Sequence, residues 1–161
     1  MENFEYISNC VEDTISFGEV LGKLLDLGDC VILDGELGAG KTQITKGVAK
    51  ALGMSKDVVS PTFNILMSYD GGLIGLNHFD LYRLEDSGEL EDVGFFEVLE
   101  DDSITLIEWG LKFPEDLPYS YLLVDVWNID ANNRRIVCST VGKKSERILL
   151  ELKQHFNKND E

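Results

Sequence analysis

The sequence predicts an α/β fold with three layers and a mixed sheet, in which some strands are parallel and others antiparallel. Residues 30–33 form a short apolar run typical of a strand buried on both faces, and a glycine-rich loop follows directly. Residues 41–52 then place apolar side chains at helical spacing. Two extended runs, 64–69 and 73–79, are joined by Asp-Gly-Gly at 70–72, which is typical of an antiparallel hairpin. This mixture of strands and helices favours a sheet covered by helices.

Apolar periodicity predicts further helices on either side of this region. Residues 11–27 place apolar side chains at helical spacing, and residues 145–156 repeat the pattern near the end of the sequence. Residues 85–102 contain nine acidic residues and no Lys or Arg, and their apolar side chains predict one or two short helices. The last five residues, 157–161, are expected to fray.

The remaining strands are predicted from short apolar runs. Residues 103–107 form a second candidate for a buried strand, and residues 121–127 and 135–141 form a further strand pair. With 161 residues, the chain can bury about two thirds of its unfolded surface in one core and is short for two ordinary domains. We therefore expect residues 1–161 to form one domain.

The charge balance argues against direct nucleic-acid binding. The chain has 30 acidic and 14 basic residues, a formal net charge of -16 at pH 7, which repels a phosphate backbone. A small basic patch, Arg134-Arg135 with Lys143-Lys144, is interpreted as a solvated turn and the start of a surface helix. The acidic run 85–102 could dock a basic partner surface, although a solvated helix face is the simpler interpretation.

Cysteine usage and the N-terminal sequence indicate a reducing compartment. Cys10, Cys30 and Cys138 are far apart, and the chain has only two histidines, so neither zinc nor a disulfide framework is expected. The first residues are acidic where a signal peptide would be basic, and no apolar run is long enough to cross a bilayer. We therefore expect a cytoplasmic protein without membrane contact.

The sequence Gly-Glu-Leu-Gly-Ala-Gly-Lys-Thr at 35–42 matches the phosphate-loop pattern Gly-x-x-x-x-Gly-Lys-Thr. In that pattern, glycines let backbone N–H groups wrap around a phosphate at a helix N-terminus. Lys41 would act on the β- and γ-phosphates of ATP, and the Thr42 hydroxyl would ligate Mg2+. The alternative is a glycine-rich turn with a solvated lysine, but the preceding strand and following helix favour a phosphate-loop NTPase fold. The residues expected at the nucleotide are Glu36, Leu37, Gly38, Ala39, Gly40, Lys41, Thr42 and Gln43.

Two acidic residues follow predicted strands, Asp80 after residues 73–79 and Glu108 after residues 104–107. In open α/β sheets, ligands bind beyond the carboxyl ends of the strands, where these carboxylates could face the phosphates and their metal. A lone acid at such a position is commonly a solvated turn residue, but two together favour a site. We expect Asp80 to bind Mg2+, usually through water, and Glu108 to lie at the metal site and position or deprotonate the attacking water.

Two further positions are compatible with a functional or a structural role. The sequence Ser-Pro-Thr-Phe at 60–63 turns after a short strand, and the Thr62 hydroxyl could sense the γ-phosphate as switch loops do. An ordinary proline turn fits this stretch about equally well. Trp109 could stack on a base or wall off the site, although a core tryptophan is the commoner case.

Four blocks of sequence, taken in order, closely resemble the bacterial TsaE family. They are the phosphate loop at 35–42, Ser-Pro-Thr-Phe at 60–63, His-Phe-Asp-Leu-Tyr-Arg at 78–83 and Glu-Trp-Gly at 108–110. The resemblance extends from the first helix to about Trp109 and becomes vague in the C-terminal third.

This resemblance implies a phosphate-loop ATPase that supports the formation of threonylcarbamoyladenosine in tRNA. It also implies the TsaD and TsaB proteins as partners, with tRNA contacted only through their complex. By position, the resemblance assigns Lys41 and Thr42 to phosphate and Mg2+, and Thr62 to a switch-like role. It assigns Asp80 to the metal site, and Glu108 and Trp109 to the remaining active-site roles.

Two other functions are compatible with the phosphate loop. A small-molecule or nucleotide kinase usually holds the transferred group with several arginines, but three of the four here lie in the C-terminal region, so a cationic lid is hard to build. A non-catalytic module is the second alternative, in which ATP or ADP changes the affinity for a partner and hydrolysis is incidental.

Overall fold

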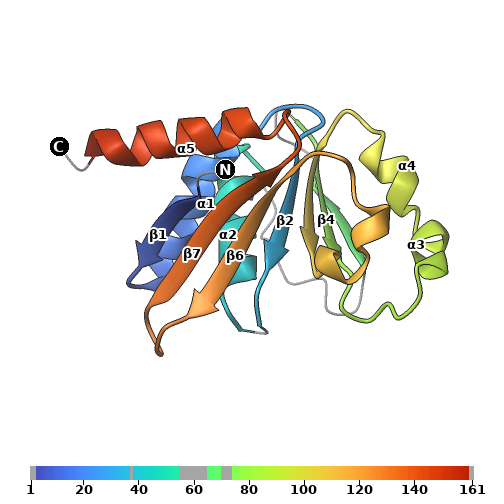
Figure 1. The fold of residues 1–161 in the computed structure, drawn as a ribbon, viewed down its shortest axis with the longest axis horizontal. Helices are drawn as coiled ribbons and strands as arrows, with labels where there is room; N and C mark the ends of the chain where they lie inside the picture. Colours follow the sequence, from blue (N-terminus) through green and yellow to red (C-terminus); the bar gives the residue numbers. More distant parts are fainter. Residues whose placement is uncertain (1–2, 37, 55–64, 70–73, 160–161) are drawn as a thin grey trace.

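The computed structural model describes residues 3–36, 38–54, 65–69 and 74–159, which form a seven-stranded sheet with helices on both faces (Figure 1). The strands lie in the order β1-β7-β6-β2-β5-β4-β3. β2 pairs in parallel with β5 and β6, and β4 pairs in parallel with β5. The pairs β1–β7, β6–β7 and β3–β4 are antiparallel, so the predicted mixed sheet is confirmed.

The bounds of the elements agree with most of the sequence predictions. The strands are β1 (Phe4–Ser8), β2 (Cys30–Asp34), β3 (Leu66–Tyr69), β4 (Leu76–Asp80), β5 (Ile104–Glu108), β6 (Tyr121–Asn128) and β7 (Arg134–Val141). The helices are α1 (Val11–Leu24), α2 (Lys41–Ala51), α3 (Gly88–Asp92), α4 (Phe95–Leu99) and α5 (Glu146–Asn159), with short 3-10 turns η1 (Gly110–Lys112) and η2 (Pro114–Asp116).

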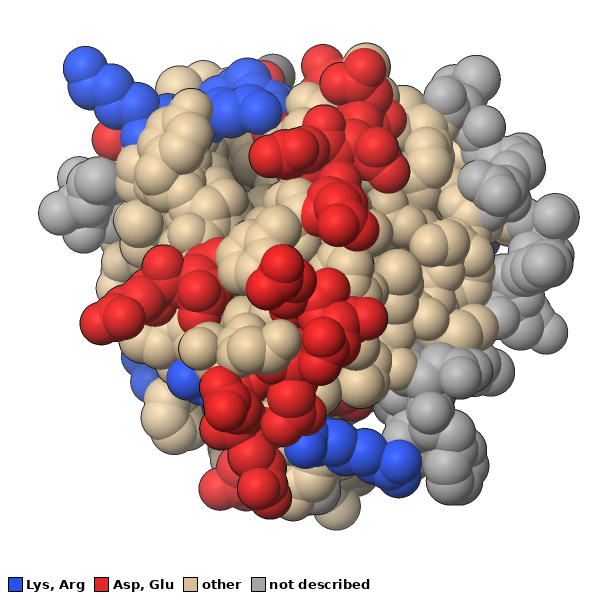
Figure 2. Space-filling model, turned by 90° about the vertical axis from the view of Figure 1, so that its right-hand side faces the viewer, with Lys and Arg blue, Asp and Glu red and all other residues tan. Residues whose placement is uncertain are grey.

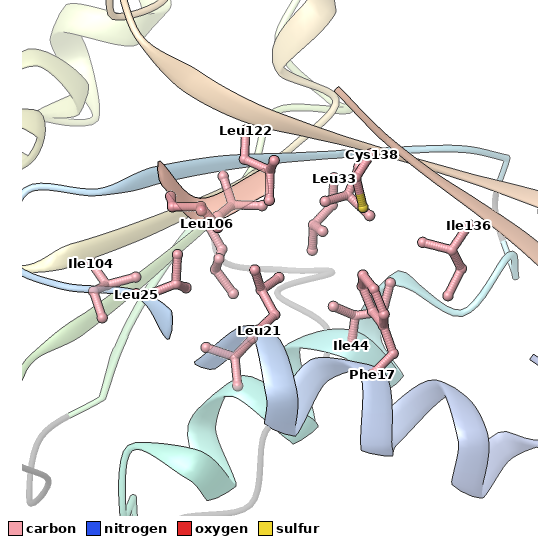
Figure 3. Close-up of a cluster of buried hydrophobic side chains, with 14 of the residues drawn as sticks. Phe17, Leu21, Leu25, Leu33, Ile44, Ile104, Leu106, Leu122, Ile136 and Cys138 are labelled. Carbon is pink, nitrogen blue, oxygen red and sulfur yellow. The ribbon is translucent and has the colours of Figure 1, made fainter. Parts of the chain in front are cut away.

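Helices cover both faces of the sheet, which confirms the three predicted layers. α1, α2 and α5 pack on one face, and α3 and α4 on the other (Figure 1). Strand β2 contributes Val31 and Leu33 to the first hydrophobic cluster, and Cys30 and Ile32 to the second. This burial on both faces explains why residues 30–33 are apolar without interruption. Phe17 of α1 lies among the side chains of the first cluster (Figure 3).

The acidic run 85–102 forms α3 and α4, as predicted, and acidic side chains gather on this face of the molecule (Figure 2). Leu90 and Phe95 are fully buried beneath the acids, and the Phe95 ring packs edge-on against Phe79 at 5.1 Å between ring centroids. The two helices therefore turn their apolar side chains to the sheet and their acids outward, as ordinary surface helices do.

The N-terminal region differs from the sequence prediction in three details. α1 ends at Leu24 rather than at residue 27, because Leu25 already has extended backbone angles. Val11, counted among the apolar helical positions, begins the helix and is 54% exposed, whereas Phe17 is fully buried. No strand is predicted at Phe4–Ser8, where β1 pairs with β7. That pairing joins opposite ends of the chain, so local sequence patterns do not reveal it.

Helices α1 and α2 pack so closely that two glycines at their contact leave no space for a side chain. A Cβ atom on Gly47 would lie 2.1 Å from the carbonyl oxygen of Ile15 and 2.7 Å from the backbone nitrogen of Glu19. A Cβ atom on Gly18 would lie 2.2 Å from the carbonyl oxygen of Ile44. This backbone contact determines where α2, and the loop that precedes it, lies on the sheet.

The parallel pairing of β2 with β6 places two carboxylates side by side. Asp34 and Asp125 are register partners across this pair. Burial raises the pKa of Asp125, and the neighbouring charge of Asp34 raises it further. Because its folded-state pKa is raised, ionised Asp125 lowers the stability of the fold at neutral pH.

Gly47→Ala is expected to lower the free energy of unfolding by about 3 kcal/mol, because the new methyl group must push α1 away from α2. Urea denaturation measures this change. Gly75→Ala is the matched control: its Cβ atom would lie 3.8 Å from its nearest neighbour, the Cβ of Ser103, so little change is expected. Equal stability of the two variants would contradict the close packing of α1 on α2.

Asp125→Asn is expected to raise the melting temperature by a few degrees at pH 8 and to have little effect at pH 4. The folded-state pKa of Asp125 lies above its unfolded value, so stability is lost as the pH rises from the unfolded pKa to the folded pKa, and the full cost is present above it. Asp130→Asn is a control of opposite sign, since hydrogen bonds from Asn133 and Asn132 lower the pKa of Asp130. Thermal melts across pH test both variants. A shift in melting temperature for Asp125→Asn that is the same at pH 4 and pH 8 would contradict the raised pKa of Asp125.

Candidate functional site

The loop between β2 and α2 has the backbone conformation that the phosphate-loop pattern predicts. Gly38 and Gly40 have φ angles of +81° and +107°, in the left-handed region that favours glycine. Gly40 is also the N-cap of α2, and its side-chain-free backbone leaves the helix without a side-chain cap. The first N–H groups of a helix have no partner within the helix and carry its positive dipole end. The loop therefore offers donors to an anion.

A cavity of about 530 Å³ opens beside this loop, within the size range of ligand pockets. Most of the site residues predicted from the sequence contribute to its wall. Those that line it are Gly38, Gly40, Lys41, Thr42, Gln43, Asp80 and Glu108. These residues come from the loop after β2, the start of α2, and the ends of β4 and β5, so the fold brings together the predicted phosphate loop and the two predicted acids.

The Lys41 side chain is only 4% exposed and is held by groups of the protein itself. Its Nζ atom donates a hydrogen bond to the Gly35 carbonyl oxygen at 2.7 Å and lies 3.9 Å from Glu108 Oε1. It also lies 4.2 Å from the centre of the Trp109 ring. Burial lowers the pKa of Lys41, whereas Glu108, Asp80 and Asp34 oppose this shift. The lysine is thus a buried cation whose charge depends on nearby carboxylates.

Asp80 and Glu108 are the last residues of β4 and β5 and are register partners across that parallel pair. Asp80 Oδ1 accepts a hydrogen bond from the backbone N–H of Tyr82 at 3.0 Å. Burial raises the pKa of Asp80; the Tyr82 hydrogen bond opposes this rise and the charge of Glu108 adds to it. Two carboxylates in one partly desolvated cavity favour a cation between or beside them.

The oxygen atoms of Thr42, Asp80 and Glu108 are of the type that Mg2+ prefers, and all three residues line the same cavity. Gln43 Oε1 is a further buried acceptor, with no hydrogen-bond partner among the described residues. The described ranges contain no group of three or more His, Cys, Asp or Glu side chains that could hold a metal alone. The donor set thus fits an ion that also takes oxygens from a ligand's phosphates, as Mg2+ commonly does.

Three residues predicted at the nucleotide, Glu36, Ala39 and Trp109, are not among those that line this cavity. Ala39 has a fully buried side chain in the core, while Glu36 and Trp109 line a second cavity of about 290 Å³ next to Asp34 and Asp125. Leu37 and Thr62 lie outside the described residues, and so does the rest of the 60–63 block.

Trp109 adopts a strained backbone conformation directly after Glu108. Its φ of 62° is the only positive value among the described residues other than glycine. The Trp109 ring packs against the Tyr82 ring, with 5.0 Å between the ring centroids. The same indole lies over Lys41 Nζ. Strain of this kind persists where the surrounding structure requires it and is frequent at functional sites. Trp109 is partly buried but is not simply a core residue.

One end of the cavity is formed by residues that the sequence did not predict to be at the site. This end is lined by the start of α1 and by the β6–β7 turn, through Cys10, Val11, Glu12, Thr14, Ala131, Asn132 and Arg134. These segments carry no motif, and β1, which brings the start of α1 to this position, is not predicted from the sequence.

The basic patch also has a different role from the predicted solvated turn. Arg134 Nε donates a hydrogen bond to the Ala39 carbonyl oxygen of the phosphate loop at 3.1 Å, and its Nη1 donates to the Asp130 carbonyl oxygen at 2.7 Å. Arg135 forms an ion pair with Glu5 on β1 at 2.9 Å. The turn at Arg134 is therefore attached to the phosphate loop.

In the part of the chain that the structure describes, no helix is both long and apolar enough to span a membrane.

Known proteins share this sequence and this fold. The family model for threonylcarbamoyl adenosine biosynthesis protein TsaE matches residues 8–136. The tRNA threonylcarbamoyladenosine biosynthesis protein TsaE of Bacillus subtilis is 37% identical over 146 residues, covering 91% of this chain and 91% of that protein. The Haemophilus influenzae protein of the same name is 40% identical over 130 residues, covering 79% and 82%. The crystal structure of Bacillus subtilis YdiB matches with a TM-score of 0.81 and 28% identity, covering 96% of each chain.

The matched family model spans most of the chain, including the phosphate loop, Asp80, Glu108 and Arg134. The relatives above 30% identity are matched over most of their own length as well. The resemblance seen in the four sequence blocks is therefore confirmed: the chain belongs to the TsaE family of tRNA threonylcarbamoyladenosine biosynthesis.

Proposed function

We propose that this protein binds ATP with Mg2+ and hydrolyses it, and that this activity serves the TsaD–TsaB complex during threonylcarbamoyladenosine formation in tRNA. The observation that supports the proposal is the convergence of Lys41, Thr42, Asp80 and Glu108 on one cavity. We further propose that residues 1–161 act as one domain in the cytoplasm, and that tRNA is contacted only through the complex, since the net charge of -16 repels nucleic acid.

The chain's own residues divide the work as follows. The loop N–H groups and Lys41 bind the phosphates, and Lys41 exchanges the Gly35 carbonyl oxygen for a phosphate oxygen. Thr42 and Asp80 would hold Mg2+, which would supply positive charge to offset that of the phosphates. Glu108 positions the attacking water and accepts its proton. Thr62 senses the γ-phosphate, and Trp109 closes the site next to Lys41.

The nucleoside of ATP would lie at the end of the cavity that is formed by the start of α1 and the β6–β7 turn. Once the phosphates lie at Lys41 and Thr42, the remaining volume is lined by the start of α1 and by Ala131, Asn132 and Arg134. Glu12 and Asn132 can hydrogen-bond a ribose or a base there, because their side chains provide carboxylate and amide groups.

The small number of basic side chains at the site favours hydrolysis over phosphoryl transfer to a second substrate. Among the described residues that line the cavity, only Lys41 and Arg134 are basic, and Arg134 Nε is hydrogen-bonded to the phosphate loop. Kinases stabilise the transferred group with several cationic side chains. Glu108 instead supplies a carboxylate, which suits activation of water.

Lys41→Ala is expected to abolish nucleotide binding, because it removes the buried cation from the cavity. Asp80→Asn and Glu108→Gln are expected mainly to lower kcat, by roughly 100-fold or more, since Asp80 would hold the metal and Glu108 would activate the water. Equilibrium binding of a fluorescent ATP analogue and phosphate release measure the two effects. Lys46→Ala, on the exposed side of α2, is the matched control and should behave as wild type. A Lys41→Ala protein with normal ATP hydrolysis would refute the site.

The pathway role is tested by reconstituting tRNA modification with TsaD and TsaB, with and without this protein. We expect the protein to increase the number of modified tRNA molecules per complex over repeated cycles, and Glu108→Gln to give no such increase. Mass spectrometry of the digested tRNA quantifies the product. If Glu108→Gln stimulates modification as much as the wild type does, hydrolysis is incidental. A second measurement compares the affinity for the partners with ATP, with ADP and with a non-hydrolysable analogue. Equal affinities in all three states would exclude a nucleotide switch.

A further inference from the structure

A fully buried histidine lies directly behind the proposed catalytic carboxylate. His78 is on β4, two residues before Asp80, so both side chains project from the same face of the strand. Its register partner on β5 is Leu106, which makes Glu108 its diagonal neighbour on that face. The Nε2 atom of His78 lies 2.5 Å from Glu108 Oε2, and the imidazole is 0% exposed.

The two oxygens of Glu108 therefore have different surroundings. Oε2 contacts His78 in the interior, whereas Oε1 lies 3.9 Å from Lys41 Nζ, the cation of the phosphate loop. A carboxylate bonded through one oxygen cannot rotate freely about its Cγ–Cδ bond. Oε1, the other oxygen of Glu108, therefore keeps a fixed direction with respect to the phosphate loop.

The hydrogen-bonding capacity of the imidazole shows which group donates. His78 Nδ1 is buried and has no hydrogen-bond partner among the described residues. A proton on Nδ1 would be a buried donor without an acceptor, which costs free energy, so a neutral ring places its proton on Nε2. The Nε2–H group then donates to Glu108 Oε2.

We propose that His78 is a positioning residue for ATP hydrolysis: through Nε2 it holds Glu108 Oε2 and so directs Oε1 to the water that attacks the γ-phosphate. This inference rests on the proposed ATPase function and adds a residue to it. His78 itself touches neither nucleotide nor water; it acts only through Glu108. A base must be held within hydrogen-bond distance of the proton that it accepts, and small displacements lower the rate steeply.

A histidine that only fills the core would give a different pattern of effects. Its loss would lower stability, or weaken nucleotide binding and turnover together. Loss of a positioning residue instead lowers kcat and leaves KM and nucleotide affinity nearly unchanged, because the phosphate loop, Lys41 and Thr42 remain in place.

The test compares His78→Gln with His78→Asn by steady-state phosphate release from the full chain with TsaD and TsaB. The Gln amide nitrogen can occupy the position of Nε2 and reach Glu108, whereas the shorter Asn amide corresponds to Nδ1 and cannot. Both are neutral amides, so their effects on the core are comparable, and thermal melts check the fold. We expect His78→Asn to lower kcat roughly 10–100-fold with an unchanged KM, and His78→Gln to restore most of the rate.

A double-mutant cycle with Glu108→Gln gives a second, independent measurement. If His78 acts through Glu108, then His78→Asn should slow the wild type but not the Glu108→Gln protein, since the group that it positions is already gone. His78→Leu replaces His78→Asn in the cycle if the Asn protein does not fold.

Three results would overturn the inference: a kcat of His78→Asn equal to wild type, no difference in kcat between His78→Gln and His78→Asn, or additive losses in the cycle. A wild-type protein that binds ATP but releases no phosphate overturns the proposed ATPase function itself, and the role of His78 falls with it. The wild-type rate therefore separates the two failures.

Discussion

The parallel pairing of β4, β5 and β2 is the constraint on which the candidate site depends. Because these strands run in one direction, they end at one edge of the sheet, with Asp80, Glu108 and Asp34 as their last residues. The register places Asp80 beside Glu108, and Glu108 beside Leu33 of β2. The phosphate loop starts directly after Asp34 at the end of the central strand β2. Its position next to Asp80 and Glu108 is therefore fixed by the strand pairing at the centre of the sheet.

The charges at this edge are arranged around one buried cation. Lys41 is desolvated, and the carboxylates of Glu108, Asp80 and Asp34 favour its charged form. Burial, and to a smaller extent the charge of Glu108, raises the pKa of Asp80 in the same place. A ligand that brings phosphates without a cation would add to this excess of negative charge. The composition of the site thus favours an anion that arrives together with a divalent metal.

The backbone around β5 shows how the fold keeps the candidate site compact. After Glu108 the chain turns through Trp109, whose positive φ carries the strain, and continues into Gly110. A Cβ atom on Gly110 would lie 3.0 Å from Ile107 Cγ2 and 3.2 Å from Ile32 Cδ1, so the turn packs directly on the central strands. The turn places the indole over Lys41, while His78 supports Glu108 from within the sheet.

The sequence alone determined the parts of this protein that depend on neighbouring residues. The glycines and Lys41 of the phosphate loop, the apolar strand at 30–33, and the acids that end β4 and β5 are local patterns, and each lies where the sequence predicted. The close contact between the backbones of α1 and α2 also requires glycine, at Gly18 and Gly47. The reason for these two glycines is visible only when the packing of the two helices is known.

The tertiary structure decided what depends on residues far apart in the chain. β1 pairs with β7, Arg134 bonds to Ala39, and His78 contacts Glu108, and none of these pairs shares a periodic or motif signal. Sheet register sets which side chains meet across strands, and register is a property of the whole fold. The sequence therefore determined which chemical groups are present at the site, whereas long-range strand pairing decided which oxygen, nitrogen and carbonyl groups contact one another.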